Sequence, residues 1–320
     1  MQTNYLGIEI GGTKLQIVLG DGQEIRTRHR FEVERSKGGA GIRRQIETAL
    51  PHLLSSSQPS AIGVGFGGPV DWKTGRICRS HQIEGWSEFE LGQWLHGLTG
   101  SPVRVDNDAN LGALGEAGRG AGTGFNPVFY VTLGSGVGGG LVVDGKTYHG
   151  DQPGEAEIGH LRLDRQGTTL ESRCSGWAVD ARIRELKTNG SSSLLCELIG
   201  EVKGSEAKHL ARALQQKDSA ALGILADLAG DLAFGLSHVV HLFHPEVIVL
   251  GGGLSLLGEP LRAAVAHALP SVVMSAFGGG PQIRLAALRE DAVPVGCLIA
   301  AKQLVGGELP IPEKPGHKVP

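Results

Sequence analysis

Two segments of this chain share one unusual pattern, in which a glycine-rich turn separates two β-rich runs. The first is 5–19, with Gly11-Gly12-Thr13-Lys14 at its centre, and the second is 128–143, where glycine fills most positions from 134 to 140. A β-rich run, a short glycine turn and a second β-rich run predict a hairpin. Because this unit occurs twice, about 125 residues apart, we expect two lobes built alike.

Strands and helices alternate along the rest of the chain, which indicates an α/β fold. The apolar patterns predict strands at 61–66, 103–105 and 247–250, and helices at 42–54, 222–243 and 293–304.

The length of 320 residues exceeds the size at which a single hydrophobic core usually keeps growing. We therefore expect a small N-terminal lobe of 1–112, completed by the C-terminal helix at about 293–306, and a large lobe of 113–292. The remaining tail, 307–320, is rich in proline and lysine and is expected to be poorly ordered.

Charge and cysteine content exclude several classes of protein. The formal net charge is only −3, and no basic cluster marks a nucleic-acid partner. The four cysteines lack any Cys-x-x-Cys spacing, so neither a disulfide framework nor a thiolate zinc cluster is indicated. No apolar run reaches the roughly 18 residues that a membrane span needs. We expect a cytoplasmic protein that contacts neither membrane nor nucleic acid.

The two glycine turns are candidate phosphate-binding loops, because glycine lets backbone N–H groups converge closely on an anion. Gly11-Gly12 alone could equally be a plain hairpin turn. The 134–140 turn excludes side chains from a whole patch, and a strand follows it, whereas a Rossmann fingerprint must open a helix. No Walker A string occurs. Phosphate held between two hairpins is typical of actin-like ATPases, a ribonuclease H-like fold with a cleft between its lobes.

Asp108 is the candidate catalytic carboxylate, in the segment Asp106-Asn107-Asp108 after a predicted strand. A carboxylate there could cap the following helix. It could instead act as the general base that a sugar hydroxyl needs when it attacks phosphorus. Asp106 could take either role.

A second polar cluster lies at 154–160, with Glu157 and His160, and Glu171 follows a short way on. Carboxylates paired with imidazole can read the fixed hydroxyls of a hexose through charge-assisted hydrogen bonds. A surface loop is the simpler explanation. Zinc binding by His160 is disfavoured, because Cys174 is the one cysteine near it in sequence.

With these motifs in view, the chain resembles the ROK family of sugar kinases and sugar-responsive repressors from Leu6 to about Leu304. The resemblance rests on six stretches, namely 6–14, 105–110, 131–140, 157–160, 170–171 and 248–255. It implies that Asp108 is the general base. It also implies sugar contacts from Gly68, Gln82, Asn107, Asp108, Glu157, His160 and Glu171. The implied nucleotide contacts are Gly11, Gly12, Thr13, Lys14, Thr132, Gly134, Ser135, Gly136, Gly252 and Gly253.

Three departures from the family pattern matter. Family members often carry a cysteine cluster near the histidine signature, whereas 161–169 has no cysteine, so we expect no structural zinc. Glu9 stands where the family usually has an aspartate near Mg²⁺, which implies a metal contact through water. Gln82 stands where an asparagine often touches the sugar. The last two changes put the identity of the hexose in doubt.

The resemblance implies an ATP-dependent hexose kinase, glucokinase-like and acting on the 6-hydroxyl, with Mg²⁺ as cofactor and a homodimeric assembly. Alternatives are a kinase for fructose, mannose, allose or an N-acetylhexosamine, and a non-catalytic sugar or nucleotide sensor. The first phosphate motif begins at Leu6, so we expect no DNA-binding segment ahead of it. The choice between ATP and polyphosphate as donor stays open.

Overall fold

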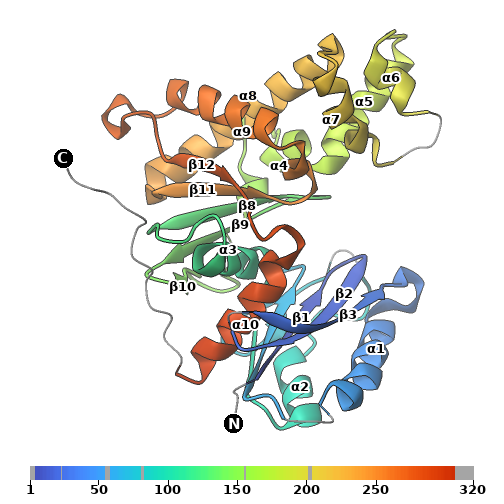
Figure 1. Ribbon diagram of the computed structural model, residues 1–320, viewed down its shortest axis with the longest axis vertical. Helices are drawn as coiled ribbons and strands as arrows, with labels where there is room; N and C mark the ends of the chain where they lie inside the picture. The colour runs from blue at the N-terminus through green and yellow to red at the C-terminus, as the bar shows by residue number, and fades with distance from the viewer. Residues whose placement is uncertain are drawn as a thin grey trace. The chain divides into compact units, whose positions relative to one another are not determined.

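The computed structural model describes residues 4–22, 24–54, 58–80, 83–154, 156–200 and 204–306. Gln82 and the tail at 307–320 lie outside the described residues. The chain forms two compact units (Figure 1). Unit 1 comprises Met1–Tyr130, Gly140–Ala156 and Ala287–Pro320, and unit 2 comprises Val131–Gly139 and Glu157–Ala286. The predicted lobe boundary at 112/113 stays a prediction.

The first five-stranded sheet has the order β3-β2-β1-β4-β7. Its strands are β1 (Tyr5–Ile10), β2 (Lys14–Gly20), β3 (Ile25–Glu32), β4 (Ala61–Phe66) and β7 (Val103–Asn107). The β1–β2 and β2–β3 pairs are antiparallel, while β1–β4 and β4–β7 are parallel. The parallel strands therefore end together, and the residues that follow β4 and β7 meet at one edge.

The described part of unit 1 contains four α-helices and a two-stranded ribbon of β5 (Val70–Asp71) and β6 (Arg76–Ile77). These helices are α1 (Gly38–Leu53), α2 (Leu91–Thr99), α3 (Asp108–Arg119) and α10 (Ala292–Leu304). The core beside α1 and α2 is mostly aliphatic, and it also contains Trp86, which is fully buried.

Glycine lets α10 lie very close to α3. A Cβ on Gly296 of α10 would come 1.8 Å from the carbonyl oxygen of Leu111, and one on Gly115 of α3 would come 2.1 Å from that of Ala292. The same helix packs on β1 and β4, where a Cβ on Gly63 would come 1.9 Å from the oxygen of Cys297. The C-terminal helix is therefore an integral layer of unit 1, and some of the many glycines serve helix packing.

The second five-stranded sheet has the order β10-β9-β8-β11-β12. Its strands are β8 (Val128–Leu133), β9 (Val137–Val143), β10 (Lys146–Thr147), β11 (Val247–Gly251) and β12 (Gln282–Leu285). Strand β3 pairs antiparallel with β2, and in the same way β10 pairs antiparallel with β9. The predicted α/β fold with a duplicated hairpin unit is confirmed.

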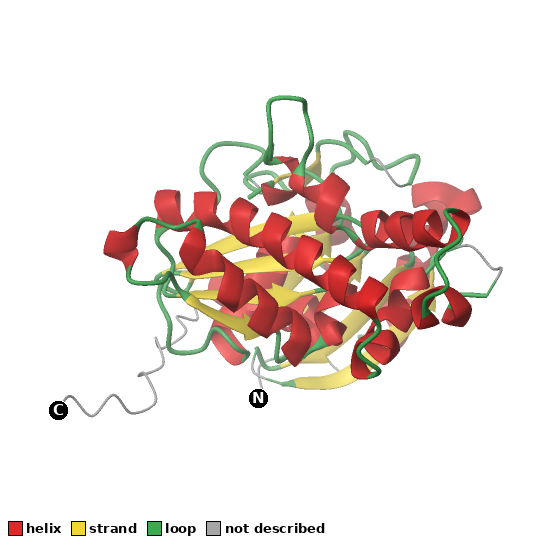
Figure 2. Ribbon diagram, turned by 90° about the horizontal axis from the view of Figure 1, so that it is seen from above, coloured by secondary structure: helices red, strands yellow, loops and turns green. Residues whose placement is uncertain are grey.

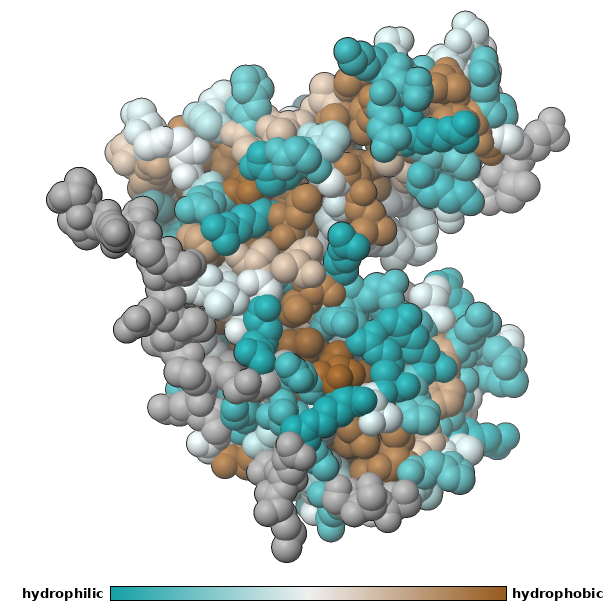
Figure 3. Space-filling model, viewed as in Figure 1, coloured by the Kyte–Doolittle hydropathy of each residue, from teal (hydrophilic) through white to brown (hydrophobic). Residues whose placement is uncertain are grey.

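Within its described residues, unit 2 contains six α-helices. Seen from above, helices lie over strands (Figure 2). The six are α4 (Leu170–Cys174), α5 (Gly176–Thr188), α6 (Leu194–Leu198), α7 (Leu210–Gln215), α8 (Ser219–Phe243) and α9 (Glu259–Ala268). Within the described ranges, α8 alone is long and apolar enough to cross a membrane, yet half of its most apolar stretch is buried in the protein. Core helices meet the same criterion, so this is weak evidence for a span. On the face shown in Figure 3, hydrophilic and apolar side chains are interspersed.

Candidate active site

The first glycine turn joins β1 to β2 in unit 1. The N–H of Gly11 donates to the oxygen of Lys14 at 3.0 Å, which closes the turn, and Arg35 Nε donates to the oxygen of Gly12. Among the described residues, the N–H groups of Gly12 and Thr13 have no protein partner. The turn therefore presents backbone donors, as an anion-binding loop requires.

Glu9 lies just before this turn, with its carboxylate buried between two donors. Lys14 Nζ lies 3.2 Å from Glu9 Oε1, and Gln16 Nε2 donates to Oε2 at 2.7 Å. Arg30 Nε donates in turn to Gln16 Oε1 at 2.9 Å. Burial raises the pKa of Glu9, and the neighbouring Lys14 opposes that rise. The carboxylate is thus held in place by a polar chain across three strands.

Asp106, near the end of β7, is one of the most enclosed carboxylates in unit 1, with 1% of its surface exposed. Its Oδ1 accepts the N–H of Asn107 at 2.9 Å and Nδ2 of Asn110 at 3.0 Å. Its Oδ2 lies 2.7 Å from His149 Nε2 and 3.5 Å from Arg104 Nη2. Because donors surround both oxygens, Asp106 is poorly placed to take a proton from a substrate.

Asn107 caps α3. Its Oδ1 accepts the N–H groups of Ala109 at 2.8 Å and Asn110 at 3.3 Å, and its extended backbone is the usual N-cap geometry. Its Nδ2 donates to the oxygen of Gly68 at 3.2 Å. The cap is therefore Asn107, and any sugar contact from this residue would have to use Nδ2.

Asp108 is the first residue of α3 and lies against the end of β4. A Cβ on Gly67 would come 3.3 Å from Asp108 Oδ2, 3.6 Å from the oxygen of Ile10 and 3.9 Å from Cα of Gly11. The structure thus gathers Asp108, the Gly67-Gly68 loop and the first glycine turn in one corner of unit 1.

The second glycine turn, in unit 2, is tied to Glu171. Oε2 of Glu171 accepts the N–H of Val137 at 2.9 Å, and a Cβ on Gly136 would come 2.5 Å from that oxygen. The N–H of Gly134 donates to the oxygen of Gly136, and the N–H of Gly176 donates to the oxygen of Gly134 at 2.7 Å. The turn between Thr132 and Val137, which includes Ser135, is therefore closed and braced by α4 and α5.

Glu157 precedes a short 3-10 helix in unit 2, Ile158–His160, whose last residue is His160. His160 Nε2 lies 4.0 Å from Glu157 Oε2, and the two side chains are 75% and 48% exposed. A Cβ on Gly159 would come 2.3 Å from the oxygen of Val137 and 3.4 Å from Cβ of Glu171. The predicted sugar-reading residues of unit 2 therefore surround its glycine turn.

Gly252 and Gly253 follow β11 in unit 2. Gly252 has φ +78°, and a Cβ there would come 2.5 Å from the nitrogen of Leu133, whereas Gly253 faces open space. The end of β11 can therefore approach the end of β8 only with glycine at position 252.

The comparisons with known proteins identify the family. The model of the family described as "ROK family" matches residues 5–304. The chain belongs to the ROK family.

Two curated relatives of this ROK protein are glucokinases. That of Halalkalibacterium halodurans is 32% identical, covering 91% of this chain and 93% of the relative. That of Thermotoga maritima is 31% identical, with 94% and 98% covered. The solved ROK family glucokinase from Streptomyces griseus, in complex with glucose and AMPPNP, is 29% identical with a TM-score of 0.80, covering 94% of this chain and 99% of that one. By this relationship the protein is a sugar kinase, a phosphotransferase.

The predicted site residues of this ROK protein fall into two groups, one in each unit. Unit 1 contributes Glu9, Gly11, Gly12, Thr13, Lys14, Gly68, Asn107 and Asp108, and unit 2 contributes Thr132, Gly134, Ser135, Gly136, Glu157, His160, Glu171, Gly252 and Gly253. Across the described residues, no group of three or more histidine, cysteine, aspartate or glutamate side chains is placed to hold a metal.

The sequence reasoning missed His149 and Arg104, which hold Asp106. His149 is stacked on Trp72 at 4.3 Å between ring centroids, and its side chain is only 7% exposed. A lone histidine 43 residues from its carboxylate partner gives no spacing signal.

Proposed function

We propose that this ROK protein transfers the γ-phosphoryl group of ATP to a hexose hydroxyl, with the 6-hydroxyl of glucose as the first choice. The relationship to glucokinases over nearly the whole chain supports the reaction class. One structural observation carries the residue assignment, namely the different surroundings of Asp106 and Asp108.

Asp108 is the proposed general base because it is less buried than Asp106 and lies beside the first glycine turn. Asp106 is enclosed by four donor groups. The capping role belongs to Asn107, and a Cβ on Gly67, beside the first glycine turn, would come 3.3 Å from Asp108 Oδ2. A general base must reach the proton that it removes, and of the two carboxylates Asp108 has the more open surroundings.

The reaction breaks one bond and forms another. The sugar hydroxyl oxygen attacks the γ-phosphorus, the bond from that phosphorus to the bridging oxygen breaks, and ADP leaves with the electron pair. Asp108 accepts the hydroxyl proton as the attack proceeds. Backbone N–H groups at the glycine turns stabilise charge on the transferring group. The proposed nucleotide contacts are Gly11, Gly12, Thr13, Lys14, Thr132, Gly134, Ser135, Gly136, Gly252 and Gly253.

Mg²⁺ fits this chain only through water. Glu9 is a hard oxygen ligand next to the first turn, but Lys14 and Gln16 already contact both of its oxygens. Mg²⁺ keeps several waters and is usually bound by one or two carboxylates together with substrate phosphates. When bound, the ion neutralises charge on the phosphates. Glu9 would accept hydrogen bonds from the waters of the ion, and Lys14 would stay beside the phosphates.

The sugar is proposed to contact Gly68, Asn107 and Asp108 from unit 1 and Glu157, His160 and Glu171 from unit 2. Because Oε2 of Glu171 is engaged by the N–H of Val137, its Oε1 is the atom proposed to accept a sugar hydroxyl. Glu157 and His160 are exposed enough to reach a ligand without rearrangement of the core. We further propose that the protein acts in the cytoplasm as a homodimer, as the family resemblance implies.

The decisive experiment compares Asp108→Asn with the parent protein in a coupled assay of ADP release. We expect kcat to fall at least about 100-fold while the glucose Kd stays within a few-fold, because the amide keeps the shape but cannot accept the proton. His96→Gln, on α2 and outside the proposed site, is the control and should keep kcat. Turnover that survives Asp108→Asn would show that another group is the base.

The choice of acceptor is tested with the same assay. Glucose, fructose, mannose, allose and N-acetylglucosamine are supplied singly at saturating ATP, and glucose is expected to give the highest kcat/KM. An absence of ADP release with every sugar would favour a non-catalytic sensor and contradict the proposal.

A further inference from the structure

One hollow in unit 1 lies apart from the proposed catalytic residues. It has a volume of about 590 Å³, which falls in the range of small-molecule pockets. Three segments form it, namely the turn 72–75 after β5, residues 103–105 of β7 and the stretch 146–149 that includes β10, and the end of α10 closes it. All of these belong to unit 1. None of the lining residues is in the proposed nucleotide or sugar set.

Positive charge dominates the wall of this pocket, which we call the β7–β10 pocket. Lys73, Arg104 and Lys146 line it, and the lining contains no aspartate or glutamate. Among the described residues neither lysine has an ion-pair partner, and only Arg104 contacts a carboxylate, that of Asp106 at 3.5 Å. Lysines that face a hollow without a counter-charge favour an anionic ligand.

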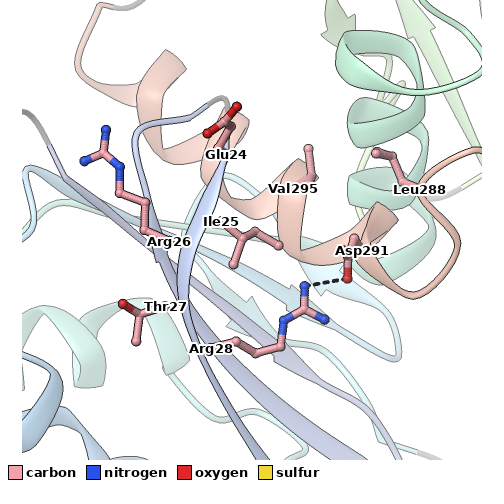
Figure 4. A pocket seen from close by; sticks show the side chains of 8 residues that line it. All are labelled: Glu24, Ile25, Arg26, Thr27, Arg28, Leu288, Asp291 and Val295. Carbon is pink, nitrogen blue, oxygen red and sulfur yellow. Dashed lines mark hydrogen bonds and ion pairs between the residues drawn. The ribbon is translucent and has the colours of Figure 1, made fainter.

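The pocket at the β3–α10 edge provides the contrast. Figure 4 shows it with Arg26 and Arg28 pointing from β3. Arg26 pairs with Asp21, and Arg28 pairs with Asp291. Its cations are already neutralised from within the protein, so the same argument does not apply there.

The wall of the β7–β10 pocket is a built surface. Arg104 Nη1 lies 3.4 Å from Oε1 of Gln303, whose Nε2 donates to the oxygen of Gly145 at 2.8 Å, and this links β7, α10 and the turn before β10. Lys73 Nζ lies 5.5 Å from the ring centroid of Trp72, which stacks on His149. These contacts position Arg104 and place Lys73 beside the ring of Trp72.

The wall also offers neutral groups to an organic ligand. The hydroxyl of Thr147 is buried without a hydrogen-bond partner, and the aliphatic side chains of Val103 and Leu304 form part of the lining. A volume of about 590 Å³ exceeds the needs of a bare phosphate ion. The combination suits a phosphate group attached to a small polar body.

We propose that the β7–β10 pocket binds the phosphate group of a small phosphorylated metabolite, with Lys73, Arg104 and Lys146 as the recognising cations. The proposal does not depend on the proposed kinase reaction, because none of its residues takes part in that reaction. A ligand bound in this pocket would draw Arg104 toward it and so change the contact of Arg104 with Asp106, which orients the segment 106–110.

The test uses the full chain with ¹⁵N-labelled tryptophan indoles, observed by NMR during titration with inorganic phosphate, with glucose 6-phosphate and with glucose. Trp72→Phe assigns the Trp72 signal. We expect that signal to shift saturably with both phosphates and not with glucose. A tighter response to glucose 6-phosphate would show that the sugar body contributes, and equal responses would show that the phosphate alone is read.

The double variant Lys73→Ala/Lys146→Ala should weaken the Trp72 response at least tenfold while its thermal unfolding midpoint stays unchanged, since both lysines are exposed. Lys208→Ala, an exposed lysine of unit 2, is the control and should respond as the parent does. A Trp72 signal that ignores phosphate, or that responds equally in the parent and the double variant, would overturn the proposal. Phosphate bound at the glycine turns would leave this local signal unmoved.

Discussion

Replacing Gly296 by alanine tests the close packing of α10 on α3. A Cβ at this position would lie 1.8 Å from the oxygen of Leu111, whereas real contacts of this kind stay beyond 3.0 Å. The two backbones would therefore have to separate by about 1.2 Å. Overpacking of this sort costs about 3 kcal/mol, and the better helix propensity of alanine offsets about 1 kcal/mol. The net loss is about 2 kcal/mol, or a fall in Tm of about 4–8 °C.

The measurement is urea and thermal unfolding followed by tryptophan fluorescence, since Trp72, Trp86 and Trp94 all belong to unit 1. Gly97→Ala in α2 is the matched control, because a Cβ there meets nothing within 4 Å. That variant should gain up to about 1 kcal/mol from helix propensity. If Gly296→Ala is as stable as Gly97→Ala, the inferred packing of α10 on α3 is wrong.

Two further predictions concern cysteine reactivity and a buried carboxylate. Burial raises the pKa of Cys174 to about 12 and that of Cys297 well above its usual value. A disulfide reagent should therefore modify half-buried Cys78 first in the folded protein. The variant Cys78→Ser should lose that fast phase of modification. Burial also raises the pKa of Glu116, although backbone N–H groups partly oppose the rise. A raised carboxyl pKa means that ionisation costs the folded state, so stability contributed by the group falls as pH rises. The free energy of unfolding in urea is compared between the parent and Glu116→Gln from pH 4 to pH 7. As pH rises, the variant should gain stability relative to the parent. A relative loss of stability in the variant would contradict the raised pKa of Glu116.

The glycine turns and the strands before them could be predicted from the sequence because their signals are local. Glycine at a strand end marks a turn, and an apolar run marks a buried strand, so β1, β4, β8 and β11 lie close to where the patterns put them. Strand β3 was missed because its sequence, IRTRHRFE, is rich in arginine. An edge strand tolerates such charges, and they protect the edge from pairing with other chains.

The helices between Leu170 and Gln215 were also missed, since most are only one or two turns long. Signals for their starts did exist. Thr169, Ser175 and Ser193 each accept a backbone N–H as the N-caps of α4, α5 and α6. Short helices show too little periodicity for such caps to be recognised without tertiary contacts.

The assignment of roles within Asp106-Asn107-Asp108 could not be made from spacing, because any of the three can cap a helix. The backbone angles at Asn107, φ −65° and ψ 147°, give it the capping role, and the enclosure of Asp106 depends on His149 from a distant segment. Such information resides in the tertiary structure and not in local pattern.

The position of α10 at the end of the chain also affects folding during synthesis. This helix packs on β1 and β4 and supplies buried Cys297, Leu298 and Ile299 to unit 1, whose first strand begins at Tyr5. During synthesis the N-terminal strands leave the ribosome long before their covering helix exists. A nascent chain that stops short of residue 292 would therefore carry an uncovered apolar sheet face, which makes truncated products natural clients of chaperones and proteases.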